Sequence, residues 1–534
     1  MSKQPEAQYD YIIVGAGSAG AALAYRLTED GTSKVLLLEA GKASHWASRF
    51  PLSFGLLIDN PAANWRFQSD PEPNTNNREI PVPRGKLLGG SSSINGLVFV
   101  RGQPLDFNLW AQFGNRGWSY EDVLPIFKRL ENYEGPTTSA RGTGGPLNVS
   151  EVADQNPLYD AWFAAAEAAG FKRNRDYNGR DQEGIVTTQT TISNGRRMST
   201  AYCYLRPAMA RPNLHVITEA LTHRVILEGK RCVGVVYEVG GHVKESRAGR
   251  ETILSAGAVC TPQILELSGI GRPDVLSQHG VAVNHALDAV GENFRDHLAA
   301  RIQWRLKVPE VSYNTRMAGL GKVKEALKYI FTRGGFVSLP SAPLLAFLKT
   351  RPDLETPDIQ LHLVPYAVKN PKKRQLHDFP GMTVSCYQLR PESLGSIHIR
   401  ANDPKCHPKI RFNFLDDPLD RRTMVDGFKL IRNFINTTPF DTYRGAEYSP
   451  GPTVTSDDDI LGWIRANSET AYHPIGTCRM APNGVVNDRL QVHGLTGLRV
   501  ADASIFPTMP SGNTNAPAIM VGEKAADLIR EDVR

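Results

Sequence analysis

The chain has 534 residues, 41% of them hydrophobic, and its 61 basic and 55 acidic residues give a net charge of +6. A chain of this length is too long to fold around a single hydrophobic core, so two or more domains are expected. The mild charge, without a basic stripe interleaved with aromatic residues, excludes nucleic acid as a predicted partner. No run approaches ~18 uninterrupted apolar residues, so no transmembrane segment is expected.

The first eight residues are polar and contain no apolar signal region, which favours a cytoplasmic protein and leaves peripheral membrane contact, and thus membrane association, open. The six cysteines contain no C-x-x-C pair, so we expect reduced thiols in a reducing compartment. The thirteen histidines show no metal-ligand spacing, and no metal site is predicted.

Residues 9–41 predict a strand, a glycine turn, a helix and a second strand. Gly15, Gly17 and Gly20 fit the pattern G-x-G-x-x-G. The first glycine permits the tight turn, the second lets a pyrophosphate approach the backbone, and the third lets the helix pack closely on the strand. The amides at the start of the helix would face the phosphates.

Glu39 ends the second predicted strand, 19 residues after Gly20. A carboxylate at this place accepts hydrogen bonds from both ribose hydroxyls and repels a 2′-phosphate. The unit therefore favours the ADP-ribose of FAD or NAD over that of NADP. It does not by itself separate FAD from NAD.

The next segments suggest a ligand cover and a cofactor loop. Residues 42–83 are rich in proline, asparagine and aromatic residues, which predicts a long excursion over a ligand. The sequence GKLLGGSSSINGLVFVRG, at 85–102, offers backbone amides and hydroxyls and leads into an apolar run. We expect it to cradle the cofactor rather than to form a flexible loop. A helix is expected within 118–134, where Ser119 and Asp122 resemble an N-cap box.

The middle of the chain predicts a mixture of strands and helices. Residues 214–239 are short β-branched runs, which predict antiparallel strands. Residues 250–271 predict a strand, a small-residue turn and a helix, and VGENFRDHLAA, at 290–300, is expected to become helical. Residues 321–335 predict an amphipathic helix.

From about residue 301 to 455 the pattern changes to that of an α+β unit. The stretch 336–350 carries no carboxylate, and IQLHLVPYAV, MTVSCYQLR, GSIHIRA and IRFNFL predict strands of one antiparallel sheet. Such a unit would suit a second domain that covers the substrate. The C-terminal stretch then places His473 before Pro474 in a loop, and Pro517 near the first turn of a final helix.

Four ordered blocks resemble the glucose–methanol–choline (GMC) family of FAD-dependent oxidoreductases. The first is GKLLGGSSSINGLVFVRG, and the second is GAVCTPQILELSGIG at 257–271. HPIGTCRM and DASIFPTMPSGNTNAP complete the set. The resemblance covers nearly the whole chain and is strongest to bacterial choline-dehydrogenase-like members, especially aliphatic alcohol dehydrogenases and the sorbose dehydrogenase type.

The resemblance implies an α/β fold, with a Rossmann-like FAD-binding domain and a second α+β substrate domain built on an antiparallel sheet. Residues 8–302 would be mostly FAD-binding, with 42–83 and about 150–200 as excursions that cover the substrate. Residues 303–470 would mostly bind substrate, and 471–534 would return to the FAD domain with the catalytic pair.

The family also implies which residues hold FAD. Some members tether the flavin through a histidine in the GGSSS loop, and here the matching position is Ile94, so non-covalent binding is expected. The cofactor-binding residues implied are Gly15, Gly17, Ser18, Ala19, Gly20, Glu39, Ala40, Trp65, Arg84, Gly85, Leu88, Gly90, Ser91, Asn95, Gly96, Leu97, Val98, Val225, Ala256, Gly257, Tyr472, Asp502, Ala503, Asn513, Asn515 and Ala516.

His473 would be the catalytic base and Asn515 its partner, the His–Asn version of the family's pair. Oxidising an alcohol removes a hydroxyl proton and a hydride from the same carbon. A histidine that titrates near neutral pH can take the proton, and the hydride would pass to flavin N5. Asn515 would hold the substrate oxygen by a hydrogen bond.

The leading hypothesis is oxidation of an aliphatic or aromatic primary alcohol to an aldehyde, since the acid-free 336–350 stretch, expected to border the pocket, disfavours a cation such as choline. A sugar or polyol dehydrogenase and an oxygen-using alcohol oxidase of the same family are the alternatives. A catalytically silent flavoprotein is disfavoured by the intact pair, and an NAD-dependent dehydrogenase by the GGSSS and NTNAP blocks. The expected partners are a small alcohol and an electron acceptor, which could be a quinone, a carrier or dioxygen.

Overall fold

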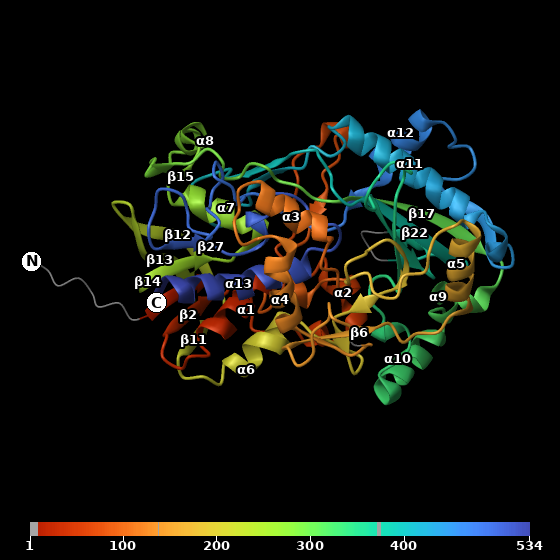
Figure 1. The fold of residues 1–534 in the computed structure, drawn as a ribbon, viewed down its shortest axis with the longest axis horizontal. Helices are drawn as coiled ribbons and strands as arrows, with labels where there is room; N and C mark the ends of the chain where they lie inside the picture. The colour runs from red at the N-terminus through yellow and green to blue at the C-terminus, as the bar shows by residue number, and fades with distance from the viewer. Residues whose placement is uncertain (1–8, 137, 371–374, 534) are drawn as a thin grey trace, which may run out of the picture.

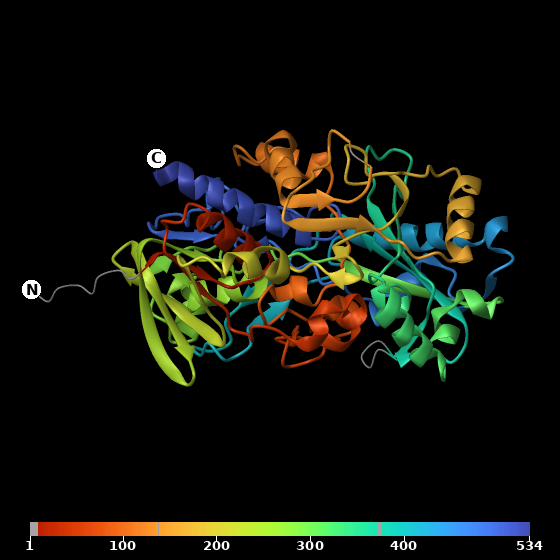
Figure 2. The same ribbon diagram turned by 90° about the horizontal axis from the view of Figure 1, so that it is seen from below.

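The computed structural model describes residues 9–136, 138–370 and 375–533. Two large sheets lie toward opposite ends of the long axis (Figure 1). The view from below keeps them apart in the same way, with the long hairpin of the first sheet at one end (Figure 2). Helices and loops fill the region between the sheets, and the cofactor and substrate residues predicted above lie largely on those loops.

The first sheet has seven strands, in the order β11-β2-β1-β14-β13-β12, with β27 paired to β14. Its strands are β1 (Tyr9–Val14), β2 (Val35–Leu38), β11 (Leu214–Ile217), β12 (Ala220–Glu228), β13 (Arg231–Val239), β14 (His242–Leu254) and β27 (Leu498–Val500). The central strands run parallel, with Ile13 opposite both Leu37 and Ile253. All four residues of β2 are buried, as expected for a parallel strand covered on both faces.

The strands within 214–239 differ in part from the prediction. Strands β12 and β13 pair antiparallel, as predicted, and β13 continues antiparallel to β14. Strand β11 instead pairs parallel with β2. It follows a helical segment, which lets the chain re-enter the sheet edge in the same direction as β2.

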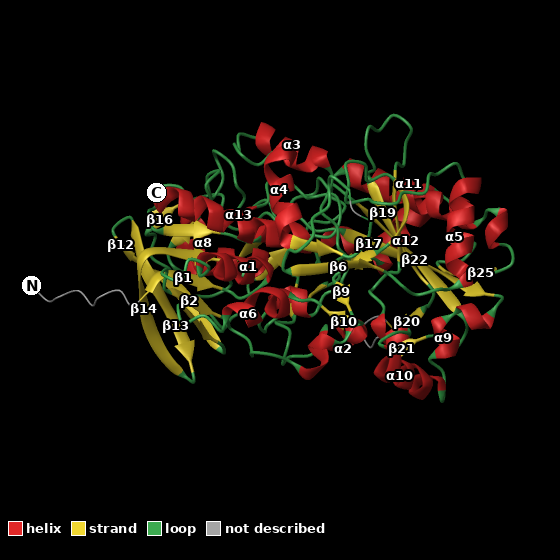
Figure 3. Ribbon diagram, turned by 60° about the horizontal axis from the view of Figure 1, so that its bottom comes forward, coloured by secondary structure: helices red, strands yellow, loops and turns green. Residues whose placement is uncertain are grey.

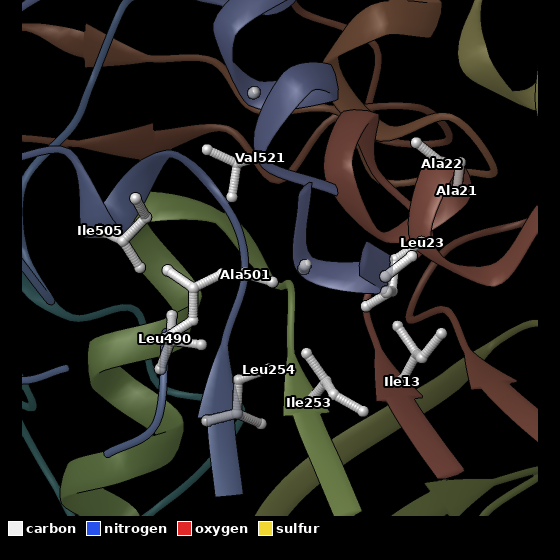
Figure 4. Close-up of a cluster of buried hydrophobic side chains, with 14 of the residues drawn as sticks. Ile13, Ala21, Ala22, Leu23, Ile253, Leu254, Leu490, Ala501, Ile505 and Val521 are labelled. Carbon is white, nitrogen blue, oxygen red and sulfur yellow. The ribbon is translucent and has the colours of Figure 1, made fainter. Parts of the chain in front are cut away.

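Two long helices cover this sheet, α1 (Ser18–Leu27) and α13 (Asn515–Val533). Figure 4 shows Ile13 and Ile253 from the strands, Leu23 from α1 and Val521 from α13 in one cluster of buried apolar side chains. The two helices touch closely, because a Cβ at Gly522 would lie 2.2 Å from the carbonyl oxygen of Ala19. This contact brings the C-terminal residues back to the glycine turn.

The second sheet also has seven strands, in the order β25-β17-β22-β19-β18-β7, with β26 paired to β17, and its pairs are antiparallel. Its strands are β7 (Gly184–Thr187), β17 (Leu298–Leu306), β18 (Leu344–Leu348), β19 (Ile359–Val364), β22 (Gly381–Gln388), β25 (Arg444–Ser449) and β26 (Glu469–Thr470). The combination of a largely parallel sheet and an antiparallel sheet confirms the predicted α/β fold with a second α+β unit.

The remaining helices vary from single turns to five turns. They are α2 (Phe54–Leu57), α3 (Pro104–Gln112), α4 (Tyr120–Leu130), α5 (Pro157–Ala168), α6 (Arg206–Ala208), α7 (Gly257–Leu267), α8 (Pro273–Gln278), α9 (Tyr313–Arg316), α10 (Gly321–Thr332), α11 (Pro418–Ile435) and α12 (Asp457–Asn467). Ser119 and Asp122 form the predicted capping box of α4. Helix α11 packs on β22, where a Cβ at Gly427 would lie 2.8 Å from Cys386 Sγ.

Short strands complete the fold (Figure 3). They are β3 (Phe67–Gln68), β4 (Pro81–Val82), β5 (Glu131–Tyr133), β6 (Leu147–Glu151), β8 (Gln189–Thr190), β9 (Ile192–Ser193), β10 (Arg196–Arg197), β15 (Ile270–Gly271), β16 (His285–Ala286), β20 (Val368–Asn370), β21 (Gln375–Leu376), β23 (Ser396–His398) and β24 (Lys409–Arg411). No helix in the described part of the chain is both long and apolar enough to span a bilayer.

Two predictions about the second half of the chain were wrong in detail. Strands β23 and β24 form their own two-stranded sheet instead of joining the large one. Residues 290–300 are not helical, because Leu298 already begins β17, whose residues alternate between the two faces of the sheet. The acid-free stretch contains β18, every residue of which is buried in the sheet.

Candidate active site

One cavity of about 610 Å³ connects the glycine turn of the first sheet with the inner strands of the second. Its walls come from β1, the 83–98 loop, the start of α7, the 471–474 loop and the start of α13 on one side. Strands β17, β19 and β22 supply the other side. A ligand here would therefore touch residues that are hundreds of positions apart in sequence.

The glycine turn has the geometry that a pyrophosphate site requires. Gly15 adopts a φ of +99°, in the region that side chains rarely reach. A Cβ at Gly20 would lie 2.0 Å from the Gly15 carbonyl oxygen, so only glycine lets α1 pack at this distance. Gly17 lines the cavity, and a Cβ added there would have no neighbour within 4 Å, so its surface is open to a ligand.

Glu39 directly follows β2, lies beside the glycine turn and lines the cavity. Its carboxylate is buried and accepts hydrogen bonds from the amides of Ala16, at 3.0 Å, and Gly41, at 2.8 Å. Burial raises the pKa of the carboxyl to about 7. Its remaining acceptor capacity suits ribose hydroxyls, which would stabilise the ionised form.

The starts of three helices meet at the same part of the cavity. Ser18, the first residue of α1, donates a hydrogen bond to Asn515, the first residue of α13, at 2.8 Å. The Asp502 carboxylate accepts from the amide of Gly257, at the start of α7, and from Thr261 Oγ1, at 2.8 and 2.7 Å. Converging helix N-termini present amides and positive dipole ends, which fits a diphosphate.

Most of the cofactor residues implied by the family line this cavity. They are Gly15, Gly17, Ser18, Ala19, Glu39, Ala40, Trp65, Arg84, Gly85, Gly90, Ser91, Asn95, Gly96, Leu97, Val98, Ala256, Gly257, Tyr472, Asp502, Ala503, Asn513 and Asn515. Ile94 also lines it. The residues present therefore fit an FAD-sized dinucleotide.

Four of the implied residues lie outside the cavity wall, namely Gly20, Leu88, Val225 and Ala516. The amide of Val225 donates to Ser268 Oγ at 2.9 Å, so it is not open to an adenine ring. Thr222 lines the cavity in its place, and its buried Oγ1 has no partner within the described residues. Thr222 lies at the start of β12, beside Ala220 and Leu221, which also line the cavity, and the sequence gives no sign that this end of the strand reaches it.

His473 lies where the cofactor part of the cavity meets the second sheet, and its side chain is almost fully buried. Its backbone amide donates to Asp296 Oδ1 at 2.8 Å, which fixes the loop before Pro474. The neighbouring Tyr472 carbonyl accepts from the Arg84 guanidinium at 2.7 Å. The loop is thus held from both sides of the site.

The structure corrects the predicted partner of His473. Asn513 Nδ2 lies 2.9 Å from His473 Nε2, whereas the side chain of Asn515 accepts a hydrogen bond from Ser18. Asn515 is the first residue of α13, so its side chain points along the start of the helix. Asn513 precedes the helix and its amide faces the histidine.

The other nitrogen of His473 is bonded to a second histidine, which sequence reasoning did not single out. His473 Nδ1 and His297 Nδ1 are 2.9 Å apart, and His297 Nε2 is 2.9 Å from the carbonyl oxygen of Leu389. A carbonyl only accepts, so His297 carries its proton on Nε2 and accepts at Nδ1. His473 therefore donates from Nδ1, which leaves a lone pair on Nε2.

Both histidines are neutral in this environment. Burial lowers the pKa of His297 to about 4. Burial lowers the pKa of His473 well below its usual range, and nearby His297 and Arg84 act in the same direction. We expected a histidine that titrates near neutral pH, and the difference arises because the ring is enclosed. Asp296, also buried, has its pKa raised to about 6.

A further polar chain continues from Asn513 into the second sheet. Gln360 Nε2 donates to Asn513 Oδ1 at 3.3 Å and lies 2.9 Å from His362 Nε2. Burial lowers the pKa of His362 to about 3, and the Tyr387 hydroxyl lies 3.3 Å from the same nitrogen. These residues, on β19 and β22, orient the Asn513 amide so that its NH₂ group faces His473. Their only sequence signal is alternation along predicted strands.

The substrate side of the cavity is lined by aromatic and polar side chains. The aromatic ones are Tyr366, Tyr448 and Trp463, and the polar ones include Gln303, Thr383 and Ser385. Among the described residues, its charged side chains are Arg301, Lys369 and Glu469. Arg301 pairs with Glu469 at 3.2 Å, so the carboxylate is already compensated.

Comparison with known proteins identifies the class. The GMC oxidoreductase family model matches residues 9–299 with its N-terminal part and residues 391–522 with its C-terminal part. The chain therefore belongs to the GMC oxidoreductase family. Among the described residues, no group of three or more His, Cys, Asp or Glu side chains could hold a metal ion.

The relatives are similar over nearly their whole length. An oxygen-dependent choline dehydrogenase of Rhizobium etli (strain CIAT 652) is 42% identical over 536 residues, covering 98% of this chain and 95% of the relative. The crystal structure of pyridoxine 4-oxidase from Mesorbium loti has a TM-score of 0.89 and 26% identity, covering 98% of this chain and 99% of that one.

An FAD-dependent oxidoreductase from Chaetomium thermophilum, solved with a fragment, has a TM-score of 0.90 and 25% identity, covering 99% of this chain and all of that one. Family membership and the fit of the cavity agree on the cofactor and the reaction class. The protein is an FAD-dependent oxidoreductase that acts on CH–OH donors.

Proposed function

We propose that the protein oxidises a primary alcohol to an aldehyde, with His473 Nε2 as the base. The observation that carries this proposal is the hydrogen-bond chain from the Leu389 carbonyl through His297 to His473 Nδ1, because it assigns the proton to Nδ1 and leaves Nε2, which faces Asn513, as the acceptor. A neutral imidazole with a defined lone pair can take a hydroxyl proton, a contribution on the order of 10²–10⁴ in rate.

The residues of the chain prepare the alcohol for oxidation. The substrate hydroxyl would take the place of Asn513 on His473 Nε2 and donate its proton there, while Asn513 Nδ2, which contacts Nε2 in the structure, would turn its hydrogen bond to the substrate oxygen. The proton taken up on Nε2 would give an imidazolium, whose Nδ1–H stays bonded to His297. FAD, when bound, supplies the acceptor for the hydride that leaves the same carbon.

The charges in the substrate region favour a neutral alcohol over a cation such as choline. Lys369 and Arg301 both line this region, and the one carboxylate, Glu469, is paired with Arg301. The acid-free 336–350 stretch contributes little to this argument, because only Ser341 of that stretch reaches the cavity. The aromatic side chains of the wall suit an aliphatic or aromatic body.

A sugar or polyol is the second candidate, because one observation favours it. Gln303, Thr383 and Ser385 line the same cavity and could bind additional hydroxyl groups. The electron acceptor is proposed to be a quinone, a carrier or dioxygen.

We also propose a division of the chain at about residues 302 and 470. The first segment would mostly bind FAD, the second would mostly bind substrate, and the third would return to the FAD-binding domain.

We also propose that FAD is held without a covalent bond. Ile94, at the position where some relatives use a histidine, is buried in a small apolar cluster and offers no nucleophile to the flavin. Acid precipitation should release the whole flavin into the supernatant. Flavin that stays with the pellet would contradict this arrangement.

The experiment for the reaction is anaerobic bleaching of the bound flavin by a panel of aliphatic, aromatic, polyol and choline alcohols. Bleaching by neutral primary alcohols supports the leading proposal, and bleaching by polyols alone would favour the second candidate. Bleaching by choline alone would contradict the charge argument. No bleaching by any alcohol would favour a silent flavoprotein, and the rate of recolouring in air separates an oxidase from a dehydrogenase.

A further inference from the structure

The apolar side of helix α10 faces solvent, whereas an ordinary surface helix turns its apolar side toward the core and exposes its polar side. In α10 the buried positions are Glu325 and Tyr329, and the large apolar residues face outward. Leu320, the residue just before α10, is 80% exposed, and Val323, Leu327, Ile330 and Phe331 within the helix are 55%, 47%, 60% and 81% exposed.

These five residues form one continuous stripe. Their spacing of three or four positions places them on one side of the helix. We call this set the α10 face. The helix is anchored from behind, because Tyr329 donates to the Gly195 carbonyl at 2.8 Å and Glu325 pairs with Arg316 at 2.8 Å. The stripe is therefore held rigidly outward.

A second exposed aromatic residue extends this surface. Trp46 is 74% exposed, and its ring lies 6.0 Å from that of Phe50, which in turn lies 5.7 Å from Tyr329. Figure 3 shows α2 and α10 at the same lower side of the molecule. Tryptophan is typical of the polar–apolar boundary of a bilayer. Phe54, in the α2 segment that follows, lines the active-site cavity.

The exposed charges of the segment that carries the stripe have one sign. Residues 313–335 contain five basic side chains and a single acidic one, Glu325, which is buried in its ion pair. Lys322, Lys324 and Lys328 are exposed on α10 itself. Within α10, which the structure describes throughout, no exposed carboxylate offsets them.

We propose that the α10 face docks on an anionic lipid surface, with its apolar stripe inserted among the acyl chains and its lysines on the headgroups. An outward apolar stripe flanked by lysines is the pattern of helices that lie in the membrane interface. A second copy of the chain is a poorer occupant, because a two-fold contact through this face would bring the same three lysines together. A bilayer here would lie close to the α2 wall of the cavity, within reach of lipid-dissolved substrates or acceptors.

The test is co-sedimentation of the flavin-loaded protein with vesicles of phosphatidylcholine containing about 25% phosphatidylserine, compared with phosphatidylcholine alone. Wild-type protein should bind the anionic vesicles, and binding should weaken as salt is raised. L327E combined with F331E should reduce binding at least about tenfold. Charge reversal of the lysines, by K322E, K324E and K328E, should reduce it by at least about fivefold for each residue, because each change removes an attracted charge and adds a repelled one.

Val243 and Lys244, exposed on β14 away from α10, provide a matched control. V243E combined with K244E should bind vesicles like the wild type. All variants should retain their flavin and their turnover of a water-soluble alcohol, so the outcome does not depend on the proposed substrate. Failure of the wild type to bind, or equal binding by all variants, would overturn the proposal. The proposal would also be overturned if the protein formed a dimer that L327E combined with F331E dissociates while vesicle binding stays unchanged.

Discussion

His297 offers a sharp test of how the base is prepared. Its Nδ1 is the acceptor for His473 Nδ1–H at 2.9 Å, and its Nε2–H is fixed by the Leu389 carbonyl. In H297A the buried Nδ1–H of His473 loses its acceptor, which costs about 1–3 kcal/mol. The competing tautomer, with the proton on Nε2, cannot act as a base, so kcat/KM should fall about 10- to 100-fold.

H297Q is the matched variant. A glutamine can accept from His473 through Oε1 and donate to the Leu389 carbonyl through Nε2, so it should restore kcat/KM to within about fivefold of the wild type. A second readout separates positioning from simple damage to the fold. Removing the enclosing ring hydrates His473, so its pKa should rise and the acid limb of kcat/KM in H297A should move to higher pH.

The assay is steady-state kinetics against pH at equal flavin content. The acid limb of the wild-type kcat/KM profile should lie below pH ~6.5, because burial lowers the pKa of His473. An unchanged rate and pH profile in H297A would refute the tautomer argument. A glutamine variant no better than the alanine variant would refute it as well.

Two further predictions concern the cofactor site and the stability of the fold. E39Q removes the buried carboxylate that would face the ribose, so the Kd for FAD in reconstitution titrations should rise about tenfold or more. An unchanged Kd would count against the ribose role. His398 lies 2.7 Å from Glu266 and 3.2 Å from Glu292, which raises its pKa to about 9. The contribution of protonated His398 to the free energy of unfolding is fully present below the unfolded-state pKa of ~6.5. It is lost as pH rises through 9, a change of about 3 kcal/mol. H398Q should therefore lose less stability than the wild type between these pH values in urea unfolding, and equal losses would contradict the assignment.

The parts predicted well from sequence are those set by neighbouring residues. The glycine turn, α1 and β2 depend on local steric limits and on continuous apolar runs, which the sequence displays directly. The capping box of α4 is similarly local, since Ser119 and Asp122 are three positions apart. Antiparallel β12 and β13 follow from a short turn between two apolar runs.

The errors arise where tertiary contacts decide. Strand β11 is parallel to β2 because of its place at the sheet edge, which no local pattern encodes. The cavity is lined by Ala220, Leu221 and Thr222, at the start of β12, and not by Val225 farther along the strand, and no local pattern encodes which end of the strand lies there. The acid-free stretch 336–350 is predicted to border the pocket, but only its Ser341 lines the cavity, and five of its residues form the buried strand β18.

The candidate site shows the same limit. His473 is identifiable from its block, but its contact with His297 joins residues 176 positions apart. The choice between Asn513 and Asn515 depends on the residue at which α13 begins, and such boundaries are uncertain by one or two positions from sequence alone. A shift of two residues exchanges the roles of the two amides.

The most direct test of the central claim is the rate of anaerobic flavin reduction by a primary alcohol in single-turnover mixing, for wild-type protein and H473A at equal flavin content. The Nε2 lone pair of His473 is the only base that the proposed reaction uses, so H473A should reduce its flavin on the order of 10²–10⁴ times more slowly. A rate within a few-fold of the wild type would show that another group takes the proton and would contradict the account.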